Sequence, residues 1–302
     1  MKWIKRGLIF QPTKAKWMIT HATLPFAEKI GEDIYRVYFS ARDQLNRSQP
    51  GFIEIDIKEP YKCLYISETP ILGLGDLGCF DDSGVTACCI VEHRSTKFLF
   101  YNGWNRGVTV PYHIYLGLAI SKDEGKTFEK ISKVPILDRN IHDPCITSSP
   151  SILIENGIWR MWYSSGGRWE VKNGKFKNYY QIKYAESRDG VDWERKGVVC
   201  IPYKSKDEYA IGRPCVLKEG SKYKMWYSYS SGSYRIGYAE SKDGVVWERK
   251  DEEVGIDVSE SGWDSESIEY PFVFIHQGKK YLLYNGNQFG KDGFGLAIET
   301  SI

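Results

Sequence analysis

Five short aromatic segments with strand-like alternation recur along the chain at intervals of about 60 residues. Each follows an apolar strand and a short turn, and each is followed by a third strand. The five segments are VYFSA (37–41), LFYNG (99–103), MWYSS (161–165), MWYSY (225–229) and LLYNG (282–286). No pattern with the period of an amphipathic helix competes with them. The sequence therefore predicts a repeated antiparallel β unit.

Three of the repeats continue through a tight turn into a fourth strand. The turns are SKDEGKTF (121–128), SRDGVDW (187–193) and SKDGVVW (241–247). In turns of this kind Asp accepts backbone N–H groups and Gly adopts the positive φ. We therefore expect Asp123, Asp189 and Asp243 to form turns and not to catalyse a reaction.

The fifth repeat ends after its third strand, and the N-terminal segment resembles a fourth strand. WIKRGLIFQP (Trp3–Pro12) matches WERKGVVCIP (Trp193–Pro202), which ends repeat three. The sequence therefore predicts a single all-β domain, a five-bladed β-propeller of four-stranded antiparallel blades closed by the N-terminal strand. The expected blades are residues 21–72, 81–137, 148–202, 212–257 and 268–302, with residues 1–12 completing the fifth.

Composition and charge exclude several classes of protein. The net charge is only +2, and Lys and Arg are scattered, so we expect no nucleic-acid partner. No apolar run approaches the roughly 20 residues of a membrane span. The seven cysteines lack metal-type spacing and indicate buried thiols in a cytoplasmic protein. The sequence does not predict an oligomeric state.

The loops on one face of the expected propeller are long and rich in Trp, Tyr, Asn and Arg, whereas those on the other face are minimal. Aromatic faces stack on sugar rings, and amides or guanidinium groups bind hydroxyls or anions, so this composition indicates a carbohydrate partner. The long loops are 41–47, 102–113, 165–180 and 285–293.

The first strand of each repeat is expected to begin at the central axis. The residues predicted at this level of one funnel are Thr23, Asp82, Ser149, Arg213 and Glu269. Carboxylates at an axis are costly unless they are used or paired, so Asp82 and Glu269 are the catalytic candidates, ahead of Asp81 and Glu266. Arg213 has two open interpretations, a site for a substrate carboxylate or phosphate and a counter-ion of Asp82 or Glu269.

The repeats and the central acids together resemble the five-bladed propeller glycosidases, the superfamily of glycoside hydrolase families 43, 32 and 130. This resemblance implies an Asp base and a Glu acid, matched here by Asp82 and Glu269, with a second Asp that tunes the acid. No second central Asp follows in the expected place, and Asp143 in RNIHDPC is the candidate substitute.

The leading hypothesis is a glycosidase-like enzyme that hydrolyses a small, acidic or phosphorylated glycan. A phosphorylase that uses phosphate and needs only one carboxylate is the alternative, and a non-catalytic carbohydrate-binding propeller is the third. We expect no cofactor and no His-based metal site. The sequence is compatible with a cation in the axial channel. The candidate substrate-binding residues are Arg213, Thr23, Ser149, Arg42, Trp104, Arg106, His113, Asp143, Arg168 and Asn285.

Overall fold

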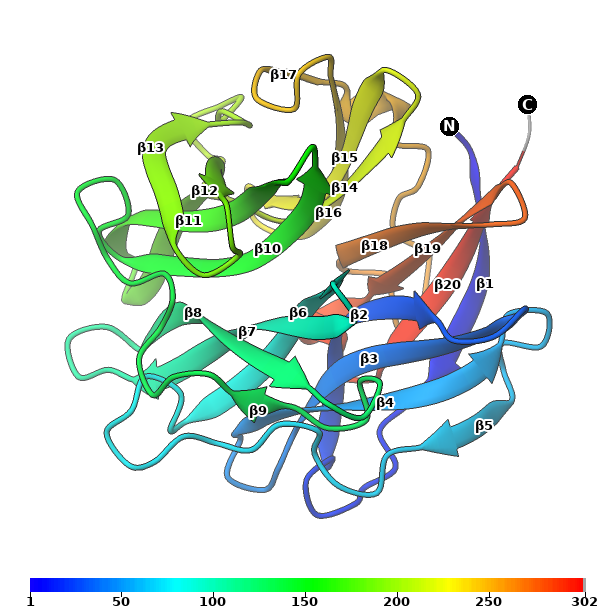
Figure 1. Cartoon of the computed structure of the whole chain (residues 1–302). Helices are drawn as coiled ribbons and strands as arrows, with labels where there is room; N and C mark the ends of the chain where they lie inside the picture. Colours follow the sequence, from blue (N-terminus) through cyan, green and yellow to red (C-terminus); the bar gives the residue numbers. More distant parts are fainter. Residues whose placement is uncertain (301–302) are drawn as a thin grey trace.

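The computed structural model describes residues 1–300 and is almost entirely β-structure (Figure 1). Within these residues it has twenty strands, a 3-10 helix at Asp251–Glu253 and a short helix α1 at Asn287–Gly290. None of the helices in this part of the chain is long and apolar enough to cross a membrane. The predicted all-β class is confirmed.

The strands form five antiparallel units of four, numbered here in chain order. Unit 1 contains β2 (Thr20–Lys29), β3 (Ile34–Arg42), β4 (Ser48–Asp56) and β5 (Cys63–Ile66). Unit 2 contains β6 (Gly84–His93), β7 (Thr96–Arg106), β8 (Tyr112–Ser121) and β9 (Glu129–Lys130). Unit 3 contains β10 (Ile146–Glu155), β11 (Ile158–Lys172), β12 (Lys175–Ser187) and β13 (Trp193–Val199). Unit 4 contains β14 (Ala210–Glu219), β15 (Lys222–Ser230), β16 (Tyr234–Ser241) and β17 (Trp247–Arg249). Unit 5 contains β18 (Glu269–His276), β19 (Lys279–Asn285), β20 (Phe294–Glu299) and β1 (Trp3–Phe10).

Backbone pairing between neighbouring units is sparse. One parallel pair, between β4 and β6, links units 1 and 2, and one between β12 and β14 links units 3 and 4. Unit 5 is a separate sheet, and no sheet in the described residues closes on itself.

A hydrogen bond of one kind nevertheless connects each unit to the next. A Ser or Asn on the second strand of one unit accepts a backbone N–H from the first strand of the following unit. The pairs, acceptor first, are Ser40–Ala87, Asn102–Ser149, Ser164–Arg213, Ser228–Tyr270 and Asn285–Leu24. The last pair returns from unit 5 to unit 1, and the five first strands contact one another in the same cyclic order.

The N-terminal strand lies where the repeat predicted it. β1 pairs antiparallel with β20, from Trp3 opposite Glu299 to Phe10 opposite Phe294. Trp3 and Phe10 are buried in two different core clusters. Residues from the two ends of the chain therefore share one unit.

The fourth strands of units 2 to 5 carry a cation that pairs with an Asp, which is buried in units 2, 3 and 5 and half-buried in unit 4. In units 2 to 5 this Asp accepts a hydrogen bond from the tyrosine of the aromatic segment. The sets of tyrosine, Asp and cation are Tyr101–Asp81–Lys130, Tyr163–Asp143–Arg195, Tyr227–Asp251–Arg249 and Tyr284–Asp264–Lys5. A buried charge is tolerated when it is paired in this way. Phe39 occupies the tyrosine position of unit 1 and has no hydroxyl.

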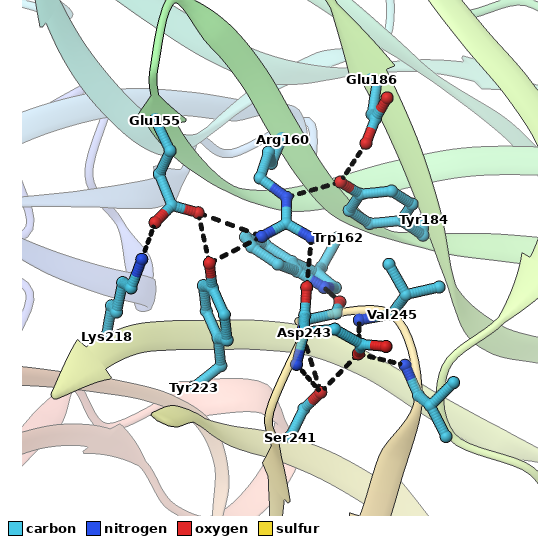
Figure 2. A network of polar contacts seen from close by, with 12 residues as sticks. Glu155, Arg160, Trp162, Tyr184, Glu186, Lys218, Tyr223, Ser241, Asp243 and Val245 are labelled. Atoms are coloured by element: carbon cyan, nitrogen blue, oxygen red, sulfur yellow. Dashed lines mark hydrogen bonds and ion pairs between the residues drawn. The ribbon is translucent and has the colours of Figure 1, made fainter. Parts of the chain in front are cut away.

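The tight turns before the fourth strands are structural, as predicted. Asp243 Oδ1 accepts the backbone N–H groups of Val245 at 2.8 Å and of the next residue at 2.9 Å. Arg160 of unit 3 donates to the Asp243 carbonyl and also to Glu155 (Figure 2). This turn of unit 4 is thus attached to the preceding unit.

Candidate active site

Four first strands approach the centre through the same backbone irregularity. Each has a register shift at a residue that precedes proline and has positive φ: Leu24, Ser149, Arg213 and Tyr270, with φ of 53°, 47°, 52° and 56°. Bulges redirect side chains, and strained residues of this kind cluster at functional sites. All four residues line one central cavity.

The central cavity has a volume of ≈ 790 Å³, which is suitable for a small ligand. Five cationic residues line it: Arg42, Arg106, Lys175, Lys177 and Arg213. Among residues 1–300, no Asp or Glu is part of its lining. This local excess of positive charge contrasts with the net charge of +2 for the whole chain. The cavity therefore suits an anionic ligand.

Arg213 is the deepest of these cations, with 3 % of its surface exposed. Its Nε and Nη2 have no hydrogen-bond partner, and none of the ion pairs between described residues includes it. The interpretation of Arg213 as a counter-ion of Asp82 or Glu269 is thus not supported by any contact. Burial lowers the pKa of Arg42, and the nearby Tyr270 opposes this shift. Burial, with Arg42 and Lys291 nearby, lowers the pKa of His21 to about 4, so this imidazole is neutral at pH 7.

Glu269 is 1 % exposed and makes one hydrogen bond. Its Oε1 accepts the Phe289 N–H at 3.1 Å, while its Oε2 has no partner. Burial raises the pKa of Glu269 well above its usual range, and the Phe289 N–H opposes this only in part. Glu269 is not itself part of the cavity lining, but its neighbours Tyr270 and Phe289 are. Burial thus favours the protonated form of this acid beside the cavity.

Two tyrosines extend the wall near this acid. The hydroxyls of Tyr180 and Tyr234 are hydrogen-bonded to each other, and both side chains line the cavity. Burial, with Tyr180, Tyr270 and Glu269 nearby, raises the pKa of Tyr234 well above its usual range. Burial likewise raises the pKa of Tyr180, so both hydroxyls are neutral at physiological pH and one donates to the other.

The predicted position of Asp82 at the centre is wrong. The residue of unit 2 that receives the inter-unit hydrogen bond is Ala87, five positions later. Asp82 instead lies in the loop before β6 and lines a second cavity of ≈ 210 Å³. Burial raises its pKa, but hydrogen bonds from Ser83, the Gly78 N–H and Asn105 outweigh this and leave the pKa lowered. Asp82 is an ionised loop residue whose oxygens have partners.

Asp143 and Asn285 were predicted to bind substrate, and neither lines the cavity. Asp143 is 0 % exposed and pairs with Arg195 at 2.9 Å and Lys183 at 3.4 Å. Asn285 is also fully buried, and its amide binds the Leu24 N–H and the carbonyls of Ala22 and Gly293. Both side chains are therefore engaged in contacts within the fold and do not face the cavity.

The other predicted residues divide into two groups. Thr23, Ser149, Arg42, Trp104 and Arg106 line the cavity together with Arg213. His113 and Arg168 are outside the lining: His113 stacks on Tyr115 at 6.4 Å, and the Arg168 guanidinium lies 4.1 Å from the Tyr179 ring. Within residues 1–300, no group of three or more His, Cys, Asp or Glu side chains is arranged to hold a metal ion.

Several lining residues were missed by the sequence analysis: Thr86, Trp169, Lys175, Lys177, Asn178, Tyr180, Tyr234, Tyr270 and Phe289. Five of them lie in residues 165–180, which were predicted to be a long functional loop and instead belong to the hairpin of β11 and β12. Tyr270 could have been found from its position before Pro271, because Ser149 and Arg213 precede prolines too.

Replacing Asp143 with alanine should destabilise the fold and leave anion binding intact. The change leaves the half-buried Arg195 and Lys183 without their partner, and breaking a buried pair costs up to about 3–5 kcal/mol. Urea unfolding gives the stability, and calorimetric titration with inorganic phosphate gives the affinity. Loss of phosphate affinity with unchanged stability would return Asp143 to the ligand site.

No family model matches the chain. Two uncharacterized proteins of Mycobacterium tuberculosis, MT1551 and Rv1502, are each 42% identical over 299 residues, 99% of this chain and 99% of theirs. A 1,2-beta-oligomannan phosphorylase of Thermoanaerobacter sp. is 33% identical over 137 residues, 44% of each chain.

Solved structures of glycoside hydrolases share the fold over almost the whole chain. One glycoside hydrolase has a TM-score of 0.77 at 18% identity and covers 99% of this chain and 92% of its own. A structure from work on the GH130 family of mannoside phosphorylases has a TM-score of 0.72 at 15% identity over 99% and 93%. A thermostable family-43 enzyme and a Bombyx mori GH32 beta-fructofuranosidase have TM-scores of 0.67 and 0.61, at 19% and 15% identity. They cover 96% and 95% of this chain, and 92% and 62% of their own. The predicted resemblance to families 43, 32 and 130 is confirmed as a likeness of fold.

Proposed function

The chain belongs to the same family as the Mycobacterium tuberculosis proteins Rv1502 and MT1551, and we propose that it cleaves a glycosidic bond with inorganic phosphate. The observation that carries this proposal is a central cavity with five cations, no lining carboxylate and an unpaired Arg213 guanidinium. The similarity to a 1,2-beta-oligomannan phosphorylase supports this class of reaction. The fold is also shared with the GH130 family, which contains both mannoside phosphorylases and glycoside hydrolases.

The proposed reaction assigns roles to two arginines of the cavity and to Glu269. Arg213 and Arg42 bind phosphate, and a phosphate oxygen attacks the anomeric carbon. The bond from that carbon to the glycosidic oxygen breaks, and Glu269 transfers its proton to the departing oxygen. The products are a sugar 1-phosphate and a free hydroxyl. Because phosphate is the nucleophile, no carboxylate base is required.

Glu269 needs access to the substrate for this step. Its Oε1 is bound by the backbone of Phe289, where φ is +62°, and Gln288 before it has φ of +54°. Such non-glycine conformations are strained. We expect this segment to shift when substrate binds, so that the free Oε2 reaches the glycosidic oxygen.

Hydrolysis by Asp82 and Glu269 is the second candidate. Its supporting observation is that Ser83 and Arg106 line both the central cavity and the smaller cavity that Asp82 lines. The lowered pKa of Asp82 suits a base. The three hydrogen bonds that hold the Asp82 carboxylate in its loop favour phosphorolysis instead.

For the fold we propose that the five units are the blades of one closed propeller, with the predicted domain boundaries. The cyclic hydrogen bonds from Ser40 through Asn285 and the pairing of β1 with β20 support this arrangement. A cytoplasmic location stays a prediction. All seven cysteines are free, as expected, but only Cys88, Cys200 and Cys215 are buried. Three others are half-buried and Cys63 is exposed.

The reverse reaction tests the proposed function. The protein is incubated with a panel of sugar 1-phosphates, each with a monosaccharide acceptor, and released phosphate is measured. We expect release with at least one donor and acceptor pair. If no pair releases phosphate and the protein cleaves aryl glycosides without phosphate, hydrolysis is favoured. Inactivity in both assays would favour the non-catalytic binding hypothesis.

Arg213→Lys should weaken phosphate binding by about 1.5–3 kcal/mol, roughly 10- to 150-fold in Kd, because the charge is kept and the two-pronged hydrogen bonding is lost. Folding stability should change little, since Nε and Nη2 have no partner to lose. Calorimetric titration with inorganic phosphate measures the effect, and Arg168→Lys outside the lining is the matched control. A variant that unfolds readily but keeps its phosphate affinity would make Arg213 structural.

A further inference from the structure

The cations of the cavity lie at two levels. Arg213 is buried and Arg42 half-buried, and the proposed phosphate uses both. Arg106 and Lys175 are exposed, Lys177 is half-exposed, and all three also line the cavity. The phosphorolysis proposal assigns no role to the outer group. A second anionic group on the substrate would account for it.

The two lysines belong to an extension of unit 3. The β11–β12 pairing continues to Lys172 opposite Lys175, whereas the corresponding β15–β16 hairpin of unit 4 ends at Ser230 opposite Tyr234. We call the outer part of the longer hairpin, residues 168–179, the arm. Its tip contains Asn173 and Gly174, both with positive φ, as a two-residue hairpin turn requires.

Aromatic contacts hold the arm against neighbouring units. The Trp169 and Tyr112 rings meet edge to face with centroids 5.0 Å apart, and the Tyr179 and Tyr209 rings do so at 6.1 Å. The Lys177 ammonium lies 4.4 Å from the centroid of the Tyr209 ring. These contacts bring arm residues into the cavity wall: Trp169, Lys175, Phe176, Lys177 and Asn178.

The arm also presents an unpartnered buried group to the cavity. Asn178 is 6 % exposed and lines the cavity, and neither its Oδ1 nor its Nδ2 has a partner with hydrogen-bond geometry. Its amide lies near Tyr112 and opposes the rise in pKa that burial imposes on that hydroxyl. A buried amide without well-placed partners is costly, and a bound ligand can supply them. Lys175 and Lys177 belong to none of the ion pairs between described residues. Ligand-binding capacity is therefore concentrated on this hairpin.

We propose that the arm is an outer subsite for an oligosaccharide that carries a phosphate group on a sugar away from the bond that is cleaved. Lys175 and Lys177 bind the oxyanion, Asn178 binds ring hydroxyls and Trp169 packs on the sugar face. This inference rests on the proposed function, because it assumes that the inner arginines hold the attacking phosphate.

The chemistry favours a phosphate monoester over a uronate. A monoester carries about −1.5 to −2 charges near neutral pH, whereas a uronate carries one. Two lysines that form no ion pair match the larger charge, and Glu170, opposite Lys177 on the arm, offsets only part of it. A neutral glycan would leave both ammonium groups without a counter-ion.

The test compares three probes by calorimetric titration: inorganic phosphate, glucose 6-phosphate and glucuronate. The double variant K175Q/K177Q should lose about tenfold or more in affinity for glucose 6-phosphate, because two charge-assisted contacts disappear. Its affinity for inorganic phosphate should stay within about twofold. Lys172→Gln, a lysine of the same arm outside the cavity lining, is the matched control and should change neither affinity. Asn178→Ala should weaken the binding of glucose 6-phosphate and leave the affinity for inorganic phosphate unchanged.

The outcomes separate the two proposals. Unchanged glucose 6-phosphate affinity in K175Q/K177Q, or an equal loss in Lys172→Gln, overturns the arm subsite. Wild-type preference for glucuronate over glucose 6-phosphate overturns the assignment to phosphate. A different experiment reports failure of the proposed function: the Arg213→Lys variant would then keep its affinity for inorganic phosphate. We expect every lysine variant to fold, because the substituted lysines have no ion-pair partner. Circular dichroism melts check this.

Discussion

Replacing Glu269 with glutamine is expected to lower turnover about 10²–10⁴-fold on substrates whose leaving group needs a proton. Activated aryl glycosides should lose much less, because their leaving groups depart without protonation. Steady-state assays on a series of leaving groups measure the difference. Wild-type activity on poor leaving groups should fall as pH rises through the raised pKa of Glu269, and the variant should lack this limb. Equal, small losses across the series would remove Glu269 from the reaction.

The same substitution should raise stability, which separates catalysis from folding. A carboxyl with a raised folded pKa binds its proton more tightly than in the unfolded chain, so stability falls as pH rises from about 4.5 towards the folded pKa. Glutamine has no such dependence. Thermal melts at pH 5 and pH 7 should therefore show a larger gain for the variant at pH 7. A destabilised variant at both values would mean that the acid is a structural partner.

Deleting Met1–Pro12 should cost roughly 5 kcal/mol or more and promote aggregation. The deletion removes the buried side chains of Trp3, Ile9 and Phe10, each worth about 1.5–3 kcal/mol, and exposes the edge of β20. It also leaves Asp264 without Lys5. Thermal melting and light scattering measure the two effects.

A milder variant keeps this prediction testable if the truncated chain does not accumulate. Trp3→Ala removes a buried ring and its hydrogen bond to the Val254 carbonyl, and should cost about 3–5 kcal/mol. Ile4→Ala, at an exposed position on the same strand, is the control. Equal melting temperatures for the truncated and full-length chains would contradict the role of β1.

The repeated units were predictable because the same residues recur for the same physical reason. Trp3, Trp193 and Trp247 each begin a fourth strand, so their similarity predicted where the N-terminus pairs. Arg213 and Ser149 were found at the centre because a proline follows each of them. The strand of unit 2 has no proline, and its central position was assigned to Asp82 instead of the region of Thr86 and Ala87.

Other parts of the site depend on contacts that the local sequence does not contain. The burial of Asp143 depends on Arg195, which is distant in sequence and lies on a fourth strand. Lys175 and Lys177 face the cavity because Trp169 packs on Tyr112 of another unit. The access of Glu269 depends on Phe289, whose backbone conformation is rare for a residue other than glycine. Such features follow from packing between units.

The central claim is that phosphate, and not water, attacks the anomeric carbon in the cavity lined by Arg213. Its most direct test is the cleavage reaction run with inorganic phosphate in water enriched in ¹⁸O, with mass spectrometry of the sugar product. The proposal predicts a sugar 1-phosphate without the label, and no product when phosphate is left out. Free sugar carrying ¹⁸O at the anomeric position, formed equally fast with and without phosphate, would contradict it.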